Sequence, residues 1–237
     1  MNNSFVLPEE SDVLDLTKYL ERALKLDAKG AVRFRAYGDV LTVYVAPISD
    51  DEYAESPLIL GLRTMALAEP AEFDVTVSLV AALAQLGKTD EEEVSLVKRL
   101  GKITKTEKAN QVTLPAELVS VSWSSETPTR IGWELGGEVS QAELTEIARK
   151  GVAEITETLP ASVGGPIAAR VRGEIWGKAF DYKYPVPMGA AFVAAGLGFL
   201  TEGEIVPWYV SGEWVRVSTQ HGHVISKFAL DYVSMNS

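Results

Sequence analysis

Residues 31–46 read AVRFRAYGDVLTVYVA and contain the pattern that decides the fold. Apolar and polar side chains alternate on both sides of Gly38-Asp39, a residue pair that favours a two-residue β-hairpin turn. When Tyr37 is placed opposite Val40, one face of the hairpin becomes entirely apolar, as a half-buried antiparallel sheet requires. That apolar face consists of Val32, Phe34, Ala36, Leu41, Val43 and Val45.

Helices are expected on both sides of this hairpin. Ser11 is placed to cap a helix that runs to about Lys29, and Gly30 is placed to end it. A third strand is expected over 58–68, and a helix over 75–86. The first half of the chain therefore has the order helix, three antiparallel strands, helix.

The second half carries similar signals. Ser140 and Glu143 form a capping box, which predicts a helix from residue 141. Alternating patterns predict strands near 117–124 and 130–135, a hairpin over 169–184 around Gly177-Lys178, and a final meander. An apolar helix is expected over 188–200. The meander comprises strands at 205–210, 213–219 and 223–229, with a turn at Ser211-Gly212 that sets Tyr209 opposite Trp214.

These elements predict an α+β protein with two domains, residues 1–104 and 112–237. The order "helix, strand with an R-x-R pair, turn, strand, helix" occurs in each half, which suggests an internal duplication. In this interpretation Arg33-Phe34-Arg35 corresponds to Arg170-Val171-Arg172. The alternative is two unrelated sheets that share the commonest alternation.

Composition excludes several classes of site. The 237 residues contain no cysteine and two histidines, so no disulfide, thiolate metal site or three-histidine metal site is available. There are 22 basic and 33 acidic residues, a formal net charge of −11 that is spread over both halves. Such acidity argues against nucleic acid and anionic membranes as partners. The first residues lack the pattern of a signal peptide, which favours a cytoplasmic protein.

Catalytic signals are weak. His221-Gly222-His223 places both histidines in one tripeptide, but a turn at Gly222 would make the rings diverge, so we predict no metal site. No G-x-S-x-G elbow is present, and Gly196 and Gly198 lack the spacing and preceding strand of a dinucleotide loop. We therefore predict no catalytic residues, no cofactor and no enzymatic activity.

The most prominent polar cluster lies on the second face of the hairpin. Arg33 and Arg35 project from it, and Arg63 is expected on the neighbouring strand. With Tyr37 and Tyr44 they form a candidate surface for a partner or anion, such as an acidic peptide or a phosphorylated ligand. The alternative is that the arginines pair with the protein's own carboxylates.

The element order of the first 90 residues resembles the small acidic α+β domain of type III secretion chaperones and related chaperone-like bacterial proteins. The helix at 12–29, the strands at 31–37, 40–46 and 58–68 and the helix from Val75 carry this resemblance. The chain is also similar to uncharacterised actinobacterial proteins. The chaperone resemblance implies a non-catalytic, usually dimeric protein that binds partner proteins. Two such units in one chain leave monomer and homodimer both open.

Our first hypothesis from the sequence is a cytoplasmic, non-enzymatic protein-binding or chaperone-like factor. The alternative is an enzyme or a small anionic-ligand-binding protein with a pocket between the two halves.

Overall fold

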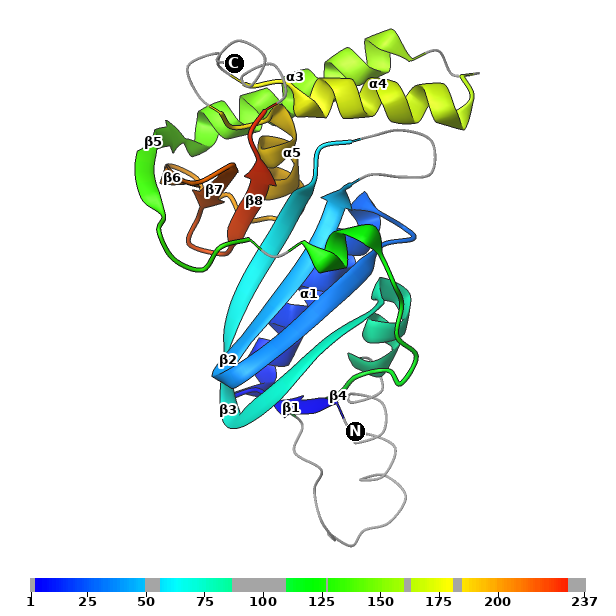
Figure 1. Cartoon of the computed structure of the whole chain (residues 1–237), viewed down its shortest axis with the longest axis vertical. Helices are drawn as coiled ribbons and strands as arrows, with labels where there is room; N and C mark the ends of the chain where they lie inside the picture. The colour runs from blue at the N-terminus through cyan, green and yellow to red at the C-terminus, as the bar shows by residue number, and fades with distance from the viewer. Residues whose placement is uncertain are drawn as a thin grey trace, which may run out of the picture. The chain divides into compact units, whose positions relative to one another are not determined.

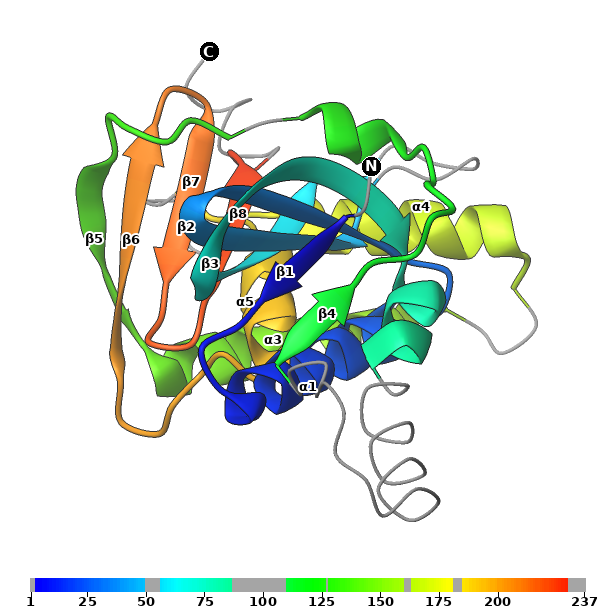
Figure 2. The same cartoon turned by 90° about the horizontal axis from the view of Figure 1, so that it is seen from below.

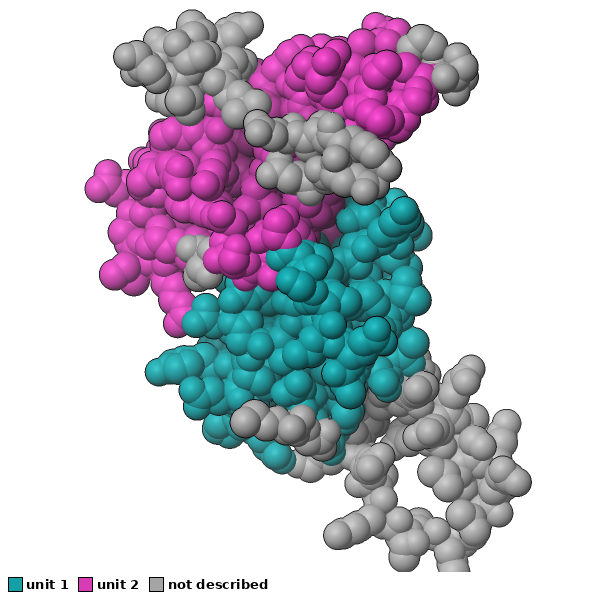
Figure 3. Space-filling model, turned by 45° about the vertical axis from the view of Figure 1, so that its right-hand side comes forward, with its two compact units in different colours: residues 1–45, 63–121 teal, residues 46–62, 122–237 magenta. Residues whose placement is uncertain are grey.

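The computed structural model describes residues 3–49, 56–86, 110–126, 128–159, 163–180 and 185–229, which form two compact units coloured separately in Figure 3. Unit 1 comprises residues 1–45 and 63–121, and unit 2 comprises residues 46–62 and 122–237. Antiparallel strands and helices occur in both, so the predicted α+β class is confirmed.

Unit 1 contains the following elements, of which β2 and β3 are shared with unit 2: β1 (Ser4–Val6), α1 (Glu10–Leu26), β2 (Ala31–Ile48), β3 (Ile59–Ser78) and β4 (Gln111–Thr113). Unit 2 adds η1 (Ser122–Ser125), β5 (Glu134–Ser140), α3 (Gln141–Thr158), α4 (Gly165–Gly177), α5 (Met188–Gly196), β6 (Ile205–Ser211), β7 (Trp214–Ser218) and β8 (His223–Lys227).

Strand β2 contains the predicted hairpin. It reverses direction at Gly38, whose φ of 62° lies in the left-handed region that glycine adopts without strain (Figure 1). The Thr42 hydroxyl donates to the Arg35 carbonyl at 3.0 Å, which agrees with pairing across this turn. All six residues predicted for the apolar face are buried, and Tyr37 and Val40 beside the turn are exposed. The predicted faces are therefore confirmed.

Helix α1 covers the apolar face in unit 1. Its buried stripe includes Leu16, Tyr19 and Leu20, and the Tyr19 hydroxyl donates to the Val43 carbonyl at 3.3 Å. The helix begins one residue before the predicted cap, because Glu9 and Asp12 form a reciprocal capping box in place of Ser11. Strands β1 and β4 form a separate antiparallel pair, visible side by side in Figure 2.

Strand β3 is longer than the sequence predicted. It passes exposed residues 68–70, reverses direction and continues to Ser78, so the helix predicted from Val75 begins at residue 79. Phe73, Val75 and Val77 alternate with polar neighbours, which is the period of a strand. The backbone N–H of Leu79 donates to the Gly30 carbonyl at 3.0 Å where this strand ends.

Unit 2 is built on a twisted antiparallel sheet in which β3, β8, β7, β6 and β5 are neighbours in that order. Figure 2 shows β5 to β8 side by side. One face is apolar and includes Val206, Val217 and Val224, all buried. Helix α5 packs against β8 and α3, and its Gly189 lies close to Ile59 on β3. The predicted capping box of α3 is confirmed, since Ser140 and Glu143 exchange hydrogen bonds.

The hairpin predicted over 169–184 is wrong. Residues up to Gly177 form α4, and residues 181–184 lie outside the described part of the chain. The segment that shows apolar–polar alternation also fits a helix, because its buried residues Ala169, Gly173 and Trp176 recur at helical spacing. Arg170 and Arg172 therefore lie on a helix, so their proposed equivalence to Arg33 and Arg35 is also wrong.

Two further local predictions need correction. Residues 122–125 form the 3₁₀ helix η1 where a strand was expected, and β5 begins at Glu134. In the meander, the three strands are confirmed, but Ser211 pairs with Trp214 across a Gly212-Glu213 turn. Gly212 has a φ of 58°, and Tyr209 consequently pairs with Arg216 in place of Trp214.

The two units are not continuous in sequence. Strands β2 and β3 contribute residues to both units, so unit 2 includes residues 46–62 as well as the C-terminal half. The predicted domains, 1–104 and 112–237, assumed a single division of the chain. No helix in the described part of the chain is long and apolar enough to cross a bilayer.

Gly151 of α3 permits the close packing of α3 on α4. A Cβ at this position would lie 2.2 Å from Cζ3 of Trp176, whose ring stacks on Phe192 at 4.5 Å between centroids. Helix propensity alone favours Ala over Gly by about 1 kcal/mol, but the clash outweighs it. We expect Gly151→Ala to lower the free energy of unfolding by about 1–2 kcal/mol, measured by urea denaturation.

Gly165→Ala is the matched control, since Gly165 is also helical and has no heavy atom within 4 Å of the added Cβ. That variant is expected to be at least as stable as the wild type. A Gly151→Ala protein with wild-type stability would contradict the packing described here.

Candidate functional site

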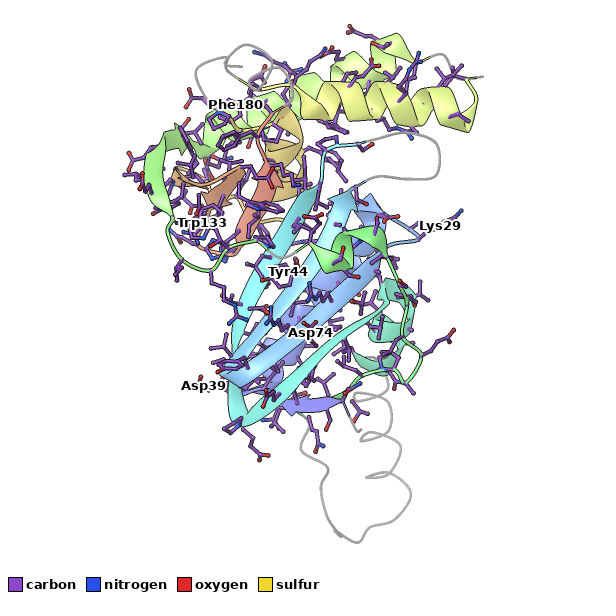
Figure 4. All side chains as sticks on the ribbon, viewed as in Figure 1. Lys29, Asp39, Tyr44, Asp74, Trp133 and Phe180 are labelled. Atoms are coloured by element: carbon purple, nitrogen blue, oxygen red, sulfur yellow. The ribbon has the colours of Figure 1, made fainter. Side chains whose placement is uncertain are left out.

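The arginines predicted as a binding surface lie on unit 1 and contact its own carboxylates. Arg33 forms a bidentate pair with Asp74 of β3, with Nε–Oδ1 and Nη2–Oδ2 distances of 2.7 Å. Asp74 is labelled in Figure 4. Arg35 Nε lies 3.6 Å from the same carboxylate. The hydrogen bond to Asp74 raises the pKa of Arg33 above its ordinary value. One carboxylate therefore serves two guanidinium groups.

Arg63 pairs with a different element. Its Nη2 lies 3.1 Å from Oδ2 of Asp15 on α1. Tyr44 is half-buried on the same strand face as Arg33 and Arg35, whereas Tyr37 is 67% exposed at the hairpin end. The structure thus places these five residues in one unit, but pairs each of the three arginines with a carboxylate.

A second polar cluster, in unit 2, was not identified from the sequence. Arg216 of β7 lies against two aromatic rings, with its Cζ 4.6 Å from the centroid of Trp133 and 4.8 Å from that of Tyr209. We call Trp133, Tyr209 and Arg216 the aromatic–arginine cluster; Figure 4 labels Trp133. A guanidinium over aromatic faces gains cation–π attraction that strengthens as water is excluded.

The sheet register fixes the neighbours of this cluster. Leu135 on β5 pairs with Tyr209, Tyr209 pairs with Arg216, and Arg216 pairs with Ile225 on β8, so these side chains share one face. Exposure falls along this row, from 62% at Leu135 to 3% at Ile225. The cluster therefore lies towards the more exposed end of this row, on the side of β5.

The segment before β5 holds Trp133 in place. The indole Nε1 donates to the Thr129 carbonyl at 3.0 Å, and the Thr129 hydroxyl donates to the Ile131 carbonyl at 2.8 Å. Gly132 has a φ of 78°, which allows the sharp turn between Ile131 and Trp133. Ile131 itself is 81% exposed. A large apolar side chain is thus exposed to solvent two residues before Trp133.

Desolvation is the main electrostatic feature of Arg216. Burial lowers the pKa of Arg216 from its ordinary value, although a guanidinium keeps its charge at neutral pH. Its Nε is buried and has no hydrogen-bond acceptor among the described residues. Within the same described part of the chain, no carboxylate oxygen lies within 4.0 Å of Arg216.

The charge of Arg216 affects the pKa of His223 on β8. Burial, followed by the positive charge of Arg216, lowers the pKa of His223 below the ordinary value of 6.5. Its Nδ1 lies 3.1 Å from the Ser218 hydroxyl. His221, the second histidine, is exposed in the turn before β8, and Gly222 between them packs against Phe199. Among the described residues, no group of three or more His, Asp or Glu side chains could hold a metal ion.

Sequence reasoning missed the aromatic–arginine cluster for two reasons. The turn predicted at Ser211-Gly212 paired Tyr209 with Trp214, a register that sets Pro207 opposite Arg216. Trp133 belongs to an irregular segment whose position no periodic pattern predicts. The only signal available was the alternation of β7, which placed Trp214 and Arg216 on the same face.

Comparison with protein families finds two matches of unassigned function. The family described as Domain of unknown function (DUF8010) matches residues 1–105, and Domain of unknown function (DUF8185) matches residues 128–230. A comparison with curated proteins gives no match.

Comparison with solved structures identifies the fold. DNA polymerase III subunit beta from Borrelia burgdorferi, in complex with a natural product, matches with a TM-score of 0.53 and 12% identity over 98% of this chain and 67% of that chain. The Helicobacter pylori beta clamp bound to a DNA ligase peptide matches with a TM-score of 0.46 and 11% identity, over 96% of this chain and 65% of the clamp. The Borrelia match shows that the chain has a sliding-clamp-like α+β fold. The chain spans about two thirds of the length of these clamps.

Removing the Asp74 carboxylate is expected to destabilise unit 1. The Arg33 side chain is only 14% exposed, so its bidentate bonds to Asp74, itself 39% exposed, are partly shielded from water. Allowing for solvent screening of the pair, we expect Asp74→Asn to lower the free energy of unfolding by about 1–2 kcal/mol. Asp15→Asn, which breaks a single contact at a more exposed carboxylate, is the matched control and should cost less. Equal stability of both variants and the wild type would contradict a structural role for the Arg33–Asp74 pair.

Arg216→Gln is expected to raise the pKa of His223 towards 6.5, because it removes a positive charge that opposes protonation. The histidine ring resonances, followed by NMR across pH, measure this change with only two histidines to assign.

The lowered pKa of His223 also makes stability depend on pH. As pH falls, His223 is protonated in the unfolded state of the wild type before it is protonated in the folded state. Stability is therefore full above about 6.5 and declines as pH falls towards the lower folded pKa. An unchanged His223 pKa in Arg216→Gln would contradict the assigned electrostatic contact.

Proposed function

We propose that this chain is a non-enzymatic protein of sliding-clamp fold that binds a partner protein through the face of the unit 2 sheet that carries Tyr209 and Arg216. The observation that carries this proposal is the aromatic–arginine cluster beside exposed Ile131 and Leu135. Tryptophan, tyrosine and arginine are the residue types that dominate binding energy at protein interfaces. Here they are arranged before any partner is bound, so little side-chain ordering is required on association.

The fold similarity supports this class of function. The chain shares its fold with DNA polymerase III subunit beta, and we take this fold as a framework for binding rather than for catalysis. A chaperone-like role, suggested by the resemblance of the first 90 residues to type III secretion chaperones, is a finer form of the same proposal.

Charge favours a protein partner over duplex DNA. The helices α1, α3, α4 and α5 together carry nine acidic and seven basic residues, and the whole chain has a formal net charge of −11. Retention on duplex DNA depends on lysine and arginine side chains that neutralise several phosphates. Neither the described helices nor the chain as a whole offers such an excess.

The surface in unit 1 is the second candidate for the same function. Tyr37 and Val40 are exposed at the end of the β2 hairpin, where an aromatic and an aliphatic side chain adjoin. However, Arg33 and Arg35 on this surface share the Asp74 carboxylate, which leaves less of their charge available to a partner. We therefore rank it below the unit 2 face.

Selection from a phage-displayed library of random peptides tests the proposal. We expect peptides enriched on the wild-type protein to lose at least tenfold in affinity, or about 1.4 kcal/mol, on Trp133→Ala. Tyr37→Ala is the matched control, because it removes an exposed aromatic residue from unit 1 and should leave binding unchanged. Melting temperatures of both variants establish that they are folded.

Two results would overturn this assignment. Loss of binding on Tyr37→Ala with retention on Trp133→Ala would move the site to the hairpin end of unit 1. Failure of any peptide to enrich above an unrelated acidic protein would contradict peptide binding altogether.

A further inference from the structure

The charge of Arg216 has no described counter-ion, although the chain has an excess of acidic residues. Arg33, Arg63 and Arg149 each lie within 3.1 Å of a carboxylate oxygen. Arg216 is more desolvated than a solvent-facing arginine, and its Nε is buried without an acceptor in the described part of the chain. A desolvated donor without a partner is unfavourable, and the penalty is relieved when an acceptor reaches it.

The stacked rings prepare Arg216 for a planar anion. The Cζ of Arg216 lies 4.6 Å and 4.8 Å from the ring centroids of Trp133 and Tyr209, and the described residues offer its Nε no hydrogen-bond acceptor. The N–H donors of a guanidinium lie along the edge of its plane. A carboxylate matches that edge in shape and accepts two parallel hydrogen bonds. The low local exposure strengthens the attraction between the two charges.

The surroundings favour a carboxylate over a phosphate. A phosphorylated group carries up to two charges and is usually held by several arginines. Lys227 lies on the same face, but it is already paired with Glu213 at 3.4 Å and Glu126 at 3.9 Å.

The apolar neighbours indicate that the carboxylate belongs to a peptide. Leu135 is directly across the strand pair from Tyr209, and Ile131 lies next to the turn that positions Trp133. Both are largely exposed, and a small free anion would leave them so. An acidic residue flanked by apolar residues would bury Leu135 or Ile131 while its carboxylate reached Arg216.

We propose that Arg216, held between Trp133 and Tyr209, binds the side-chain carboxylate of an acidic residue in a partner peptide whose apolar neighbours pack on Ile131 and Leu135. This inference rests on the proposed function and specifies the chemistry of the partner at that surface.

A pair of blocked peptides tests the assignment on the full-length protein. The probes are acetyl-Leu-Glu-Leu-amide and acetyl-Leu-Gln-Leu-amide, which differ only in the charge of the central side chain. Binding is followed through the Trp133 indole and Arg216 Nε N–H resonances by NMR, with the indole assigned from Trp133→Phe. We expect the Glu peptide to bind about tenfold more tightly than the Gln peptide, as a charge-assisted hydrogen bond predicts.

Variants then locate the effect. Arg216→Gln should abolish the preference for Glu, and Arg216→Lys should retain only part of it, because an ammonium lacks the planar fork. Lys227→Gln is the matched control, since it removes a cation from the same face that is already paired, and the preference should persist. Melting temperatures identify any variant that fails to fold, and Arg216→Lys then provides the comparison.

Several outcomes would overturn the inference. Equal binding of the Glu and Gln peptides would remove the carboxylate from the site while leaving peptide binding at this face intact. Tighter binding of the corresponding phosphoserine peptide would assign a phosphate, and acetate that binds as tightly as the Glu peptide would assign a small-anion site. Absence of any shift at Trp133 or Arg216 with either peptide would remove the site itself.

Discussion

The alternation of buried and exposed side chains along β2 and β3 is the constraint on which the rest of the structure depends. Both strands reverse direction, and both contribute residues to each compact unit. A shift of one residue in register would turn the apolar face of residues 32–45 to solvent and place Arg33 and Arg35 in the core. Helix α1 is positioned by one face of these strands, and the Arg33–Asp74 pair by the other.

Patterns that are local in the sequence were enough to predict much of this fold. The hairpin at Gly38 and the start of α3 each depend on residues within a few positions of one another, so their backbone preferences and caps agree with the final structure. The prediction failed over 169–184, where period-two and helical patterns coexist. There the packing of Trp176 on Gly151, more than 20 residues away, favours the helix.

The candidate site was harder to predict than the fold because it depends on contacts between strands. The assumed turn at Ser211-Gly212 kept Tyr209 and Arg216 on the correct face of the sheet but gave Tyr209 the wrong partner. A two-residue change in register leaves the face of each side chain unchanged and alters every cross-strand pair. The contribution of Trp133 depends on Gly132 and Thr129 in an irregular segment, for which no periodicity exists.

The arginines of this acidic chain differ in whether they contact one of its carboxylates. With 33 acidic residues available, pairing with an internal carboxylate is the expected state of an arginine, and Arg33, Arg63 and Arg149 follow it. Arg216 differs because its neighbours across the strands are Tyr209 and Ile225, and because the Trp133 ring lies 4.6 Å from its Cζ. Aromatic and aliphatic side chains thus stand where carboxylates would otherwise lie. They offset part of the desolvation of Arg216 through cation–π attraction, but they supply no hydrogen-bond acceptor. The same packing that keeps the carboxylates of the described residues away from Arg216 leaves its Nε without a hydrogen-bond acceptor among them.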